Sequence, residues 1–243
     1  MNFMTITHPT LSISAVLAAM LTFNTSALAG DLHQLDSLSQ TEFLALSKDL
    51  AATTSTKSIE PAASLGIAGF DVNASTTLTQ TQASSAWQTV SGNSMSELVQ
   101  ARLSVSKGLS SKTDVSGFVS KVSSANISAA GVAVKYALID GNVVMPAVAV
   151  RGSYSRMGGV SGMTLNNTGL DLLVSKGFVG FTPYVGVGTV YSQAQATGQA
   201  DESFRQSKSF AGVSWNMLLL NVSAEYDRTG KNASYGVKAG LRF

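Results

Sequence analysis

The sequence contains no cysteine, and beyond residue 29 it contains no long hydrophobic run. Without cysteine the chain can form neither a disulfide framework nor a lipid-modified cysteine anchor. The longest later apolar run, residues 143–150, is short and is interrupted by Pro146, whereas a membrane-spanning helix needs about 20 apolar residues. These absences exclude a disulfide-stapled secreted module and a helical membrane protein, so stability must come from packing and from closure of the fold.

A strong excess of one charge is also missing, and histidine is scarce. The 16 Lys and Arg residues nearly balance the 14 Asp and Glu residues, which gives no indication of nucleic acid as a partner. Neither of the two histidines, His8 and His33, lies in a segment with a strand pattern. Enzymes that move a proton near neutral pH usually rely on histidine, and many metal sites use His or Cys. We therefore expect no enzymatic activity, no cofactor and no metal site.

The first 29 residues carry no Lys, Arg, Asp or Glu. They are mostly apolar from Leu11 to Phe23 and end in a small-x-small pattern at Ala27 and Ala29, which is typical of a signal peptidase site. The residues before Leu11 lack the usual positive side chains, so an uncleaved anchor is the alternative. Threonine and serine interrupt the run, which does not suit a spanning helix. We predict a cleaved signal peptide over residues 1–29 and export of the rest of the chain.

From residue 65 onward, apolar and polar residues alternate with a period of two. Alternating segments of about ten residues, separated by Gly, Asn, Asp and Ser clusters, are typical of a transmembrane β-barrel. An Arg or Lys facing lipid at mid-membrane would cost about 2–4 kcal/mol, so the charged face must line the lumen. We predict an all-β, antiparallel up-and-down barrel over residues 64–243. Ten strands are expected: 66–78, 97–107, 113–122, 127–139, 146–156, 164–176, 181–192, 206–217, 219–228 and 233–243. Residues 113–122 alternate poorly, so eight strands is the alternative.

The last strand shows the alternation most cleanly. One face carries Tyr235, Val237, Ala239, Leu241 and the terminal Phe243, and the other carries Ser234, Gly236, Lys238, Gly240 and Arg242. This terminus resembles the closing strand of Gram-negative outer-membrane β-barrel proteins, whose final Phe the barrel-assembly machinery reads. In architecture the chain resembles the small OmpA-like and opacity-type barrels.

That resemblance implies a location in the cell outer membrane. It also implies contact with outer-membrane lipids and lipopolysaccharide, and recognition of the C-terminal strand by the assembly machinery; we expect a monomer. Phe243 then fixes the periplasmic end of the barrel, and an even number of strands returns the chain to that side. The resemblance names no substrate.

Residues 30–63 form a separate polar segment ahead of the barrel. Ser39 and Glu42 have the spacing of a capping box, and Phe43, Leu46 and Leu50 follow at helical intervals. We predict a short amphipathic periplasmic helix followed by a linker. The helix either rests on the periplasmic rim, which is the simpler interpretation, or plugs the barrel or docks a partner.

Charged residues recur at similar depths on the predicted inward faces. This lumen charge belt comprises Asp71, Arg102, Lys135, Arg151, Asp171, Glu225 and Lys238. Counted from the periplasmic strand ends, six of them form three pairs on neighbouring strands about 4.8 Å apart: Asp71 with Arg102, Arg151 with Asp171, and Glu225 with Lys238. Lys135 lies near the same level without an obvious partner.

Segment 181–192 is irregular, because Tyr184 and Tyr191 are an odd number of residues apart and cannot share a face of a regular strand. Either Gly186 and Gly188 form a bulge, or Tyr184 points inward over them.

Two functions fit the belt. Its ion pairs can neutralise one another in a packed lumen, or they can form a charged constriction that selects solutes. Barrels near eight strands are just wide enough for side chains to fill. We predict a structural barrel or a narrow passive channel for small solutes. The alternatives are surface recognition or adhesion through loops 79–96 and 193–205 and, less favoured, a lipid-modifying enzyme.

Overall fold

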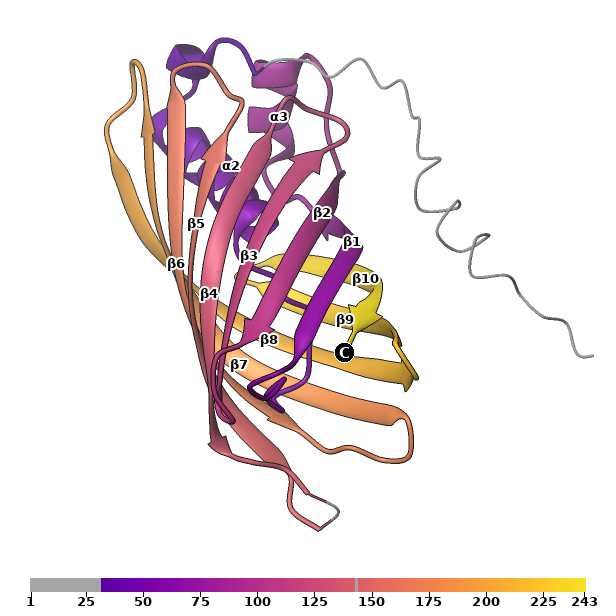
Figure 1. Ribbon diagram of the computed structural model, residues 1–243. Coiled ribbons are helices and arrows are strands. Elements are labelled where there is room, and N and C mark those ends of the chain that lie inside the picture. Colours follow the sequence, from indigo (N-terminus) through magenta and orange to yellow (C-terminus); the bar gives the residue numbers. More distant parts are fainter. Residues whose placement is uncertain (1–31, 143) are drawn as a thin grey trace, which may run out of the picture.

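The computed structural model describes residues 32–142 and 144–243, and within them ten antiparallel strands close into one barrel (Figure 1). The strands are β1 (Phe70–Gln80), β2 (Glu97–Gly108), β3 (Thr113–Val122), β4 (Ser128–Ile139), β5 (Ala147–Gly158), β6 (Met163–Ser175), β7 (Phe181–Ala196), β8 (Glu202–Met217), β9 (Leu220–Thr229) and β10 (Asn232–Arg242). Sequence neighbours pair, and β1 pairs with β10 to close the ring. The predicted ten-strand barrel is confirmed. The eight-strand alternative is wrong, because residues 113–122 form a strand paired on both sides.

The predicted signal peptide, with its cleavage motif at Ala27 and Ala29, lies outside the described residues.

The barrel has two distinct rims. At one, the Phe70 amide donates to the Phe243 carbonyl at 2.6 Å and the Phe243 amide donates back to the Phe70 carbonyl at 3.0 Å. We call this end the C-terminal rim; its connections are residues 109–112, 140–146, 176–180 and 218–219. The opposite end is the helical rim, with connections 81–96, 123–127, 159–162, 197–201 and 230–231. The first of these contains helix α3 (Ser84–Ser91).

Side chains alternate between the two faces of the barrel wall as the sequence predicts. Large apolar side chains are exposed on the outer face, among them Val72, Leu103, Val132, Val134, Leu170, Leu172, Val185, Val187, Val237 and Leu241. Every member of the predicted lumen charge belt is buried on the inner face. Because a water-soluble barrel would reverse this arrangement, the outer surface is suited to lipid. The chain is a membrane-type β-barrel.

In the irregular segment 181–192, the first tyrosine, Tyr184, points into the lumen. Strand β7 pairs regularly with both neighbours, without a bulge, and Tyr184 is buried in the lumen. A Cβ atom at Gly212, opposite Tyr184 on β8, would lie 2.4 Å from its ring. A Cβ at Gly186 would likewise lie 2.2 Å from the ring of Phe210. Inward aromatic rings therefore occupy the space that these glycines leave.

The predicted helix is present as α2 (Gln40–Thr54), preceded by a short 3-10 turn, η1 (Leu35–Ser37). Its capping box is formed: the Glu42 amide donates to the Ser39 hydroxyl at 3.3 Å, and the Ser39 amide and hydroxyl donate to the Glu42 carboxylate at 3.1 and 2.7 Å. These hydrogen bonds hold the pKa of Glu42 below its usual range. No helix within the described residues is long and apolar enough to cross a membrane.

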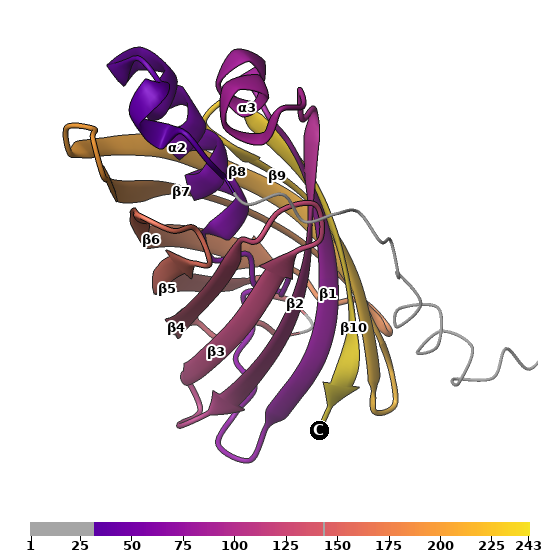
Figure 2. The same cartoon turned by 90° about the horizontal axis from the view of Figure 1, so that it is seen from above.

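The position of α2 differs from the expected one. The sequence predicts a helix at the rim that carries Phe243, but α2 lies beside α3 at the helical rim (Figures 1 and 2). Its apolar face, with Phe43, Leu46 and Leu50, packs in one buried cluster with Trp87 of α3. Inward side chains near that rim complete the cluster: Leu98, Val122, Ile127, Met157, Met163, Leu165 and Ala194. Burial of this apolar face fixes the helix in the helical mouth of the barrel.

Candidate functional site

Residues 55–69, which we call the lumen segment, run through the barrel from α2 to the start of β1. Their first residues contact Arg102 and their later residues contact Asp114, near the C-terminal rim. Side chains from Ser55 to Lys57 and from Ile59 to Ala62 are almost fully buried. The barrel is therefore filled by its own chain. A plug was an alternative prediction for the helix; in the structure the segment that follows the helix fills the lumen, and α2 itself packs at the helical mouth.

Backbone carbonyls of the lumen segment accept hydrogen bonds from cations of the barrel wall. Arg102 donates to the carbonyls of Ser55 and Lys57, both at 2.9 Å, and Lys208 donates to the carbonyl of Thr56 at 2.9 Å. Nearer the C-terminal rim, the Lys135 ammonium donates to the carbonyls of Pro61 at 3.2 Å and Ala63 at 3.0 Å. Buried backbone acceptors and buried cations satisfy one another in this way.

The two charged side chains of the lumen segment are also paired with the wall. Lys57 forms a buried ion pair with Asp227 of β9. Glu60 lies 3.5 Å from the Lys135 ammonium and 3.6 Å from the Arg151 guanidinium. Since isolated charges are very costly in a dry interior, these contacts make the segment and the wall electrostatically dependent on each other.

The wall contributes ion pairs of its own, and one predicted pair is confirmed. Arg151 and Asp171 are directly opposite on β5 and β6, and the guanidinium donates two hydrogen bonds to one carboxylate oxygen, at 3.0 and 2.7 Å. Lys208 lies 3.3 Å from the same oxygen. Arg151 and Lys208 also contact the face of the Phe210 ring, which adds cation–π attraction.

The other two predicted pairs are wrong. Asp71 lies opposite Ser106, four residues from the level of Arg102, because β1 begins at Phe70 and residues 66–69 form a turn. It pairs instead with Arg242 at 2.7 Å and Lys238 at 3.5 Å on β10. Neighbouring barrel strands are staggered, so equal distances from strand ends do not give equal depth.

The stagger between neighbouring strands also separates Glu225 from Lys238. Gly236, and not Lys238, faces Glu225 on the neighbouring strand. The Glu225 carboxylate accepts a hydrogen bond from the Tyr184 hydroxyl at 2.9 Å. Lys135, for which the sequence shows no obvious partner, pairs with Asp114, whose carboxylate lies 3.2 Å from its ammonium.

The predicted lumen charge belt omits five buried lumen charges: Lys57, Glu60, Asp114, Lys208 and Asp227. The alternation of β8 could have revealed Lys208, which shares its inward parity with Phe210 and Gly212. Asp114 belongs to the poorly alternating segment. No periodic signal marks Lys57 or Glu60, because their segment is neither helix nor strand.

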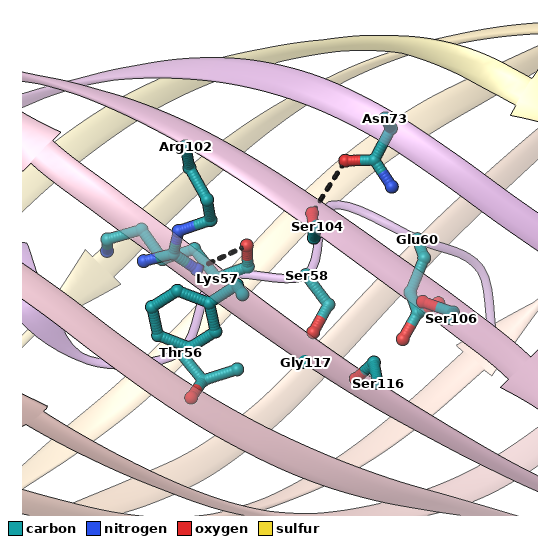
Figure 3. Close-up of a pocket in the computed structure, with 11 residues that line it drawn as sticks. Thr56, Lys57, Ser58, Glu60, Asn73, Arg102, Ser104, Ser106, Ser116 and Gly117 are labelled. Atoms are coloured by element: carbon teal, nitrogen blue, oxygen red, sulfur yellow. Dashed lines mark hydrogen bonds between the residues drawn. The ribbon is translucent and has the colours of Figure 1, made fainter.

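Two hollows adjoin the lumen segment. A cavity of about 10 Å³ lies between the segment and the wall, lined by Thr56, Lys57, Ser58, Glu60, Asn73, Arg102, Ser104, Ser106, Ser116, Gly117 and Phe118 (Figure 3). That volume holds about one water molecule, and Arg102 Nε and Thr56 Oγ1 are buried there without a protein partner. A wider depression of about 590 Å³ opens at the C-terminal rim beside residues 63–67. Neither feature amounts to a pore through the described barrel.

The C-terminal strand has the two faces that the assembly-signal prediction requires. Tyr235, Val237, Leu241 and Phe243 are exposed on the outer face, and Ala239 lies between them on that face but is itself buried. Tyr235 also packs against Tyr226 of β9, with ring centroids 5.3 Å apart. Recognition of this strand by assembly machinery stays a prediction.

Within residues 32–142 and 144–243, no group of three or more acidic or histidine side chains is placed to hold a metal ion. His33, the one histidine in this part of the chain, is exposed in the approach to η1. The arrangement of buried, mutually compensating charges is suited to packing.

Neither the scan of protein-family models nor the search of curated proteins found a match. Among solved structures, the chain is similar to the N-terminal β-barrel domain of Pseudomonas aeruginosa OprF, with 15% identity over 73% of this chain and 99% of that chain and a TM-score of 0.37. It is also similar to the KdgM porin, with 10% identity over 72% and 99% and a TM-score of 0.37. Neisserial surface protein A matches with 12% identity over 72% and 94% and a TM-score of 0.31. The fold assignment rests on the strand pairing, because these TM-scores are too low to support it.

Proposed function

We propose that this chain is an outer-membrane β-barrel with a structural role, which its own lumen segment keeps closed to solutes. The observation that carries the proposal is the continuous set of contacts between residues 55–65 and the inner wall, from Arg102 to Asp114. The cavity beside the segment, of about 10 Å³, holds about one water molecule, which agrees with a filled lumen. Of the two functions that the sequence allows, the filled barrel is favoured over the narrow passive channel.

The outer-membrane location is part of the same proposal. It is supported by the apolar outer face and by the strand period. The lipid-facing residues would contact outer-membrane lipids and lipopolysaccharide, and β10 would engage the assembly machinery. The proposal places the C-terminal rim in the periplasm, and the long connection 81–96 at the helical rim agrees with that orientation.

Conductance of the purified full chain in a planar bilayer tests the proposal. We expect no discrete conductance steps, together with heat-modifiable migration on a gel that shows the barrel to be folded. A locked variant, Ala62→Cys with Ser175→Cys, provides the matched control, since the Ala62 amide donates to the Ser175 hydroxyl at 3.1 Å and the chain has no other cysteine.

The oxidised and reduced forms of the locked variant separate the outcomes. Silence in both forms supports a closed barrel. Steps that occur only after reduction would show that the lumen segment leaves a conducting pore, and steps that persist after oxidation would show a narrow channel beside the segment. Either result overturns the closed structural barrel.

A further inference from the structure

The described chain crosses from one rim of the barrel to the other eleven times. Ten strands bring β1 and β10 to the same rim, where Phe70 and Phe243 are hydrogen-bonded. Leu32 and α2 nevertheless lie at the helical rim (Figure 1). The lumen segment makes the eleventh crossing, through the inside of the barrel. The two ends of the described chain therefore lie at opposite rims of the barrel, although its strand number is even.

We propose that the barrel carries its own amino-terminal segment through its lumen and displays residues 32–54 on the cell surface. The inference rests on the proposed outer-membrane location, with the C-terminal rim in the periplasm. An exported chain reaches the outer membrane from the periplasm. Residues 32–54 must therefore cross with the barrel as it closes, and a segment that remained behind could not reach its observed contacts.

Those contacts are made with connections that belong to the helical rim. The His33 amide donates to the Val90 carbonyl in α3 at 2.9 Å. The Gln199 side chain, in the β7–β8 connection, donates to the carbonyls of Leu35 at 2.8 Å and Leu38 at 2.9 Å. The Gln40 side chain donates to the Ala200 carbonyl at 3.1 Å. Residues 32–54 are thus held at the helical rim by α3, which follows β1, and by the connection between β7 and β8.

A buried carboxylate completes this attachment. Asp49 of α2 accepts hydrogen bonds from the amides of Gln82 and of the N-cap residue Ala83, each at 3.0 Å, immediately before α3. Asn232, at the beginning of β10, donates to the same carboxylate at 2.7 Å. An anion at a helix N-terminus is favourable because the first amides of the helix lack internal partners. The Asp49 side chain therefore joins α2 to the connection that follows β1 and to the start of β10.

The lumen segment has the dimensions and composition that a crossing requires. Residues 55–65, fully extended at about 3.3 Å per residue, reach about 36 Å, which exceeds the roughly 25 Å of an outer-membrane apolar band. Most of these residues are Ser, Thr, Ala or Pro. The large Ile59 passes the wall at a glycine: a Cβ at Gly236 would lie 2.8 Å from its Cδ1 atom. A slender chain therefore fits inside ten strands.

Single-cysteine labelling of intact cells tests the inference, since the chain has no cysteine of its own. Asp36→Cys reports on the amino-terminal segment, Lys231→Cys on the helical rim, and Ser111→Cys on the C-terminal rim; all three side chains are exposed. We expect a membrane-impermeant maleimide to label the first two on intact cells. Ser111→Cys should react only after the outer membrane is permeabilised. Heat-modifiable migration shows that each variant is folded.

The pattern of labelling separates failure of this inference from failure of the proposed location. Labelling of Lys231→Cys on intact cells, with Asp36→Cys reactive only after permeabilisation, would overturn the crossing and leave the outer-membrane barrel standing. Labelling of Ser111→Cys alone on intact cells would reverse the orientation and overturn both. If no variant reacts until the cells are permeabilised, the outer-membrane location fails and the inference with it.

Discussion

The Asp49 carboxylate of α2 accepts a hydrogen bond from the indole nitrogen of Trp87 in α3, at 2.9 Å, and both side chains are buried. The same carboxylate accepts hydrogen bonds from the amides of Gln82 and Ala83, immediately before α3, and from the side chain of Asn232. None of the described cations lies within ion-pair distance of it. Neutral donors alone surround this carboxylate. The helices α2 and α3 together form a cap over the helical mouth of the lumen, and this cap depends on an acceptor-only side chain at position 49.

We expect Asp49→Asn to loosen the cap without unfolding the barrel. The amide has one acceptor oxygen where the carboxylate has two, and its NH₂ group faces donors. Hydrogen bonds to a charged group contribute roughly 1.5–3 kcal/mol, so a loss of that order is expected in the stability of the cap. Urea titration followed by Trp87 fluorescence, in a Trp215→Phe background, measures it.

The matched control is Asp36→Asn, the same change at an exposed carboxylate of η1. It should alter stability by no more than about 0.5 kcal/mol. Equal effects of the two substitutions would show that Asp49 is not a specific attachment point.

Lys57→Met should destabilise the folded protein strongly. It leaves Asp227 buried without its cation, and removal of one partner from a buried pair costs about 3–5 kcal/mol. Adding Asp227→Asn should restore much of the lost stability, because the uncompensated charge is then gone. Equilibrium unfolding of the two single variants and the double variant provides the cycle. Additive losses would contradict the pairing of the lumen segment with the wall.

Much of the wall could be predicted from sequence, because the bilayer imposes a local rule on every strand. A lipid-facing position must be apolar, so two-residue alternation identified the strands and the inward parity of the charged residues. The pairing of Arg151 with Asp171 followed from their similar depth. Pairings that depend on the stagger between strands, such as Asp71 with Arg242, could not be obtained by counting from strand ends.

No comparable local rule predicts which residues fill the lumen. The lumen segment has neither a helical nor a strand period, and its contacts join residues more than a hundred positions apart, as Lys57 and Asp227 do. The helix α2 was recognisable from its capping box, but its place depends on tertiary burial of Phe43, Leu46 and Leu50. Long-range packing, which leaves no local pattern, decided which rim the helix occupies.

Gly212→Ala should overpack the lumen. A Cβ there would lie 2.4 Å from the Tyr184 ring and 2.7 Å from the Ala224 carbonyl, so the ring must move. We expect a loss of about 1–3 kcal/mol in unfolding free energy. Gly152→Ala is the matched control, since a Cβ at Gly152 meets no atom within 4 Å. Indistinguishable unfolding of the two variants would show that Tyr184 does not pack over Gly212.

A quencher carried by lipid should reduce the fluorescence of Trp215 but not that of Trp87. Trp215 is exposed on the outer face of β8, at the end near the C-terminal rim, whereas Trp87 is buried in the cap. In bilayers with brominated acyl chains, the Trp87→Phe variant, which retains Trp215, should lose much of its fluorescence relative to unbrominated bilayers. The Trp215→Phe variant, which retains Trp87, should be unaffected. Strong quenching of Trp87 would place the cap in contact with lipid, and an unquenched Trp215 would contradict a lipid-facing outer wall.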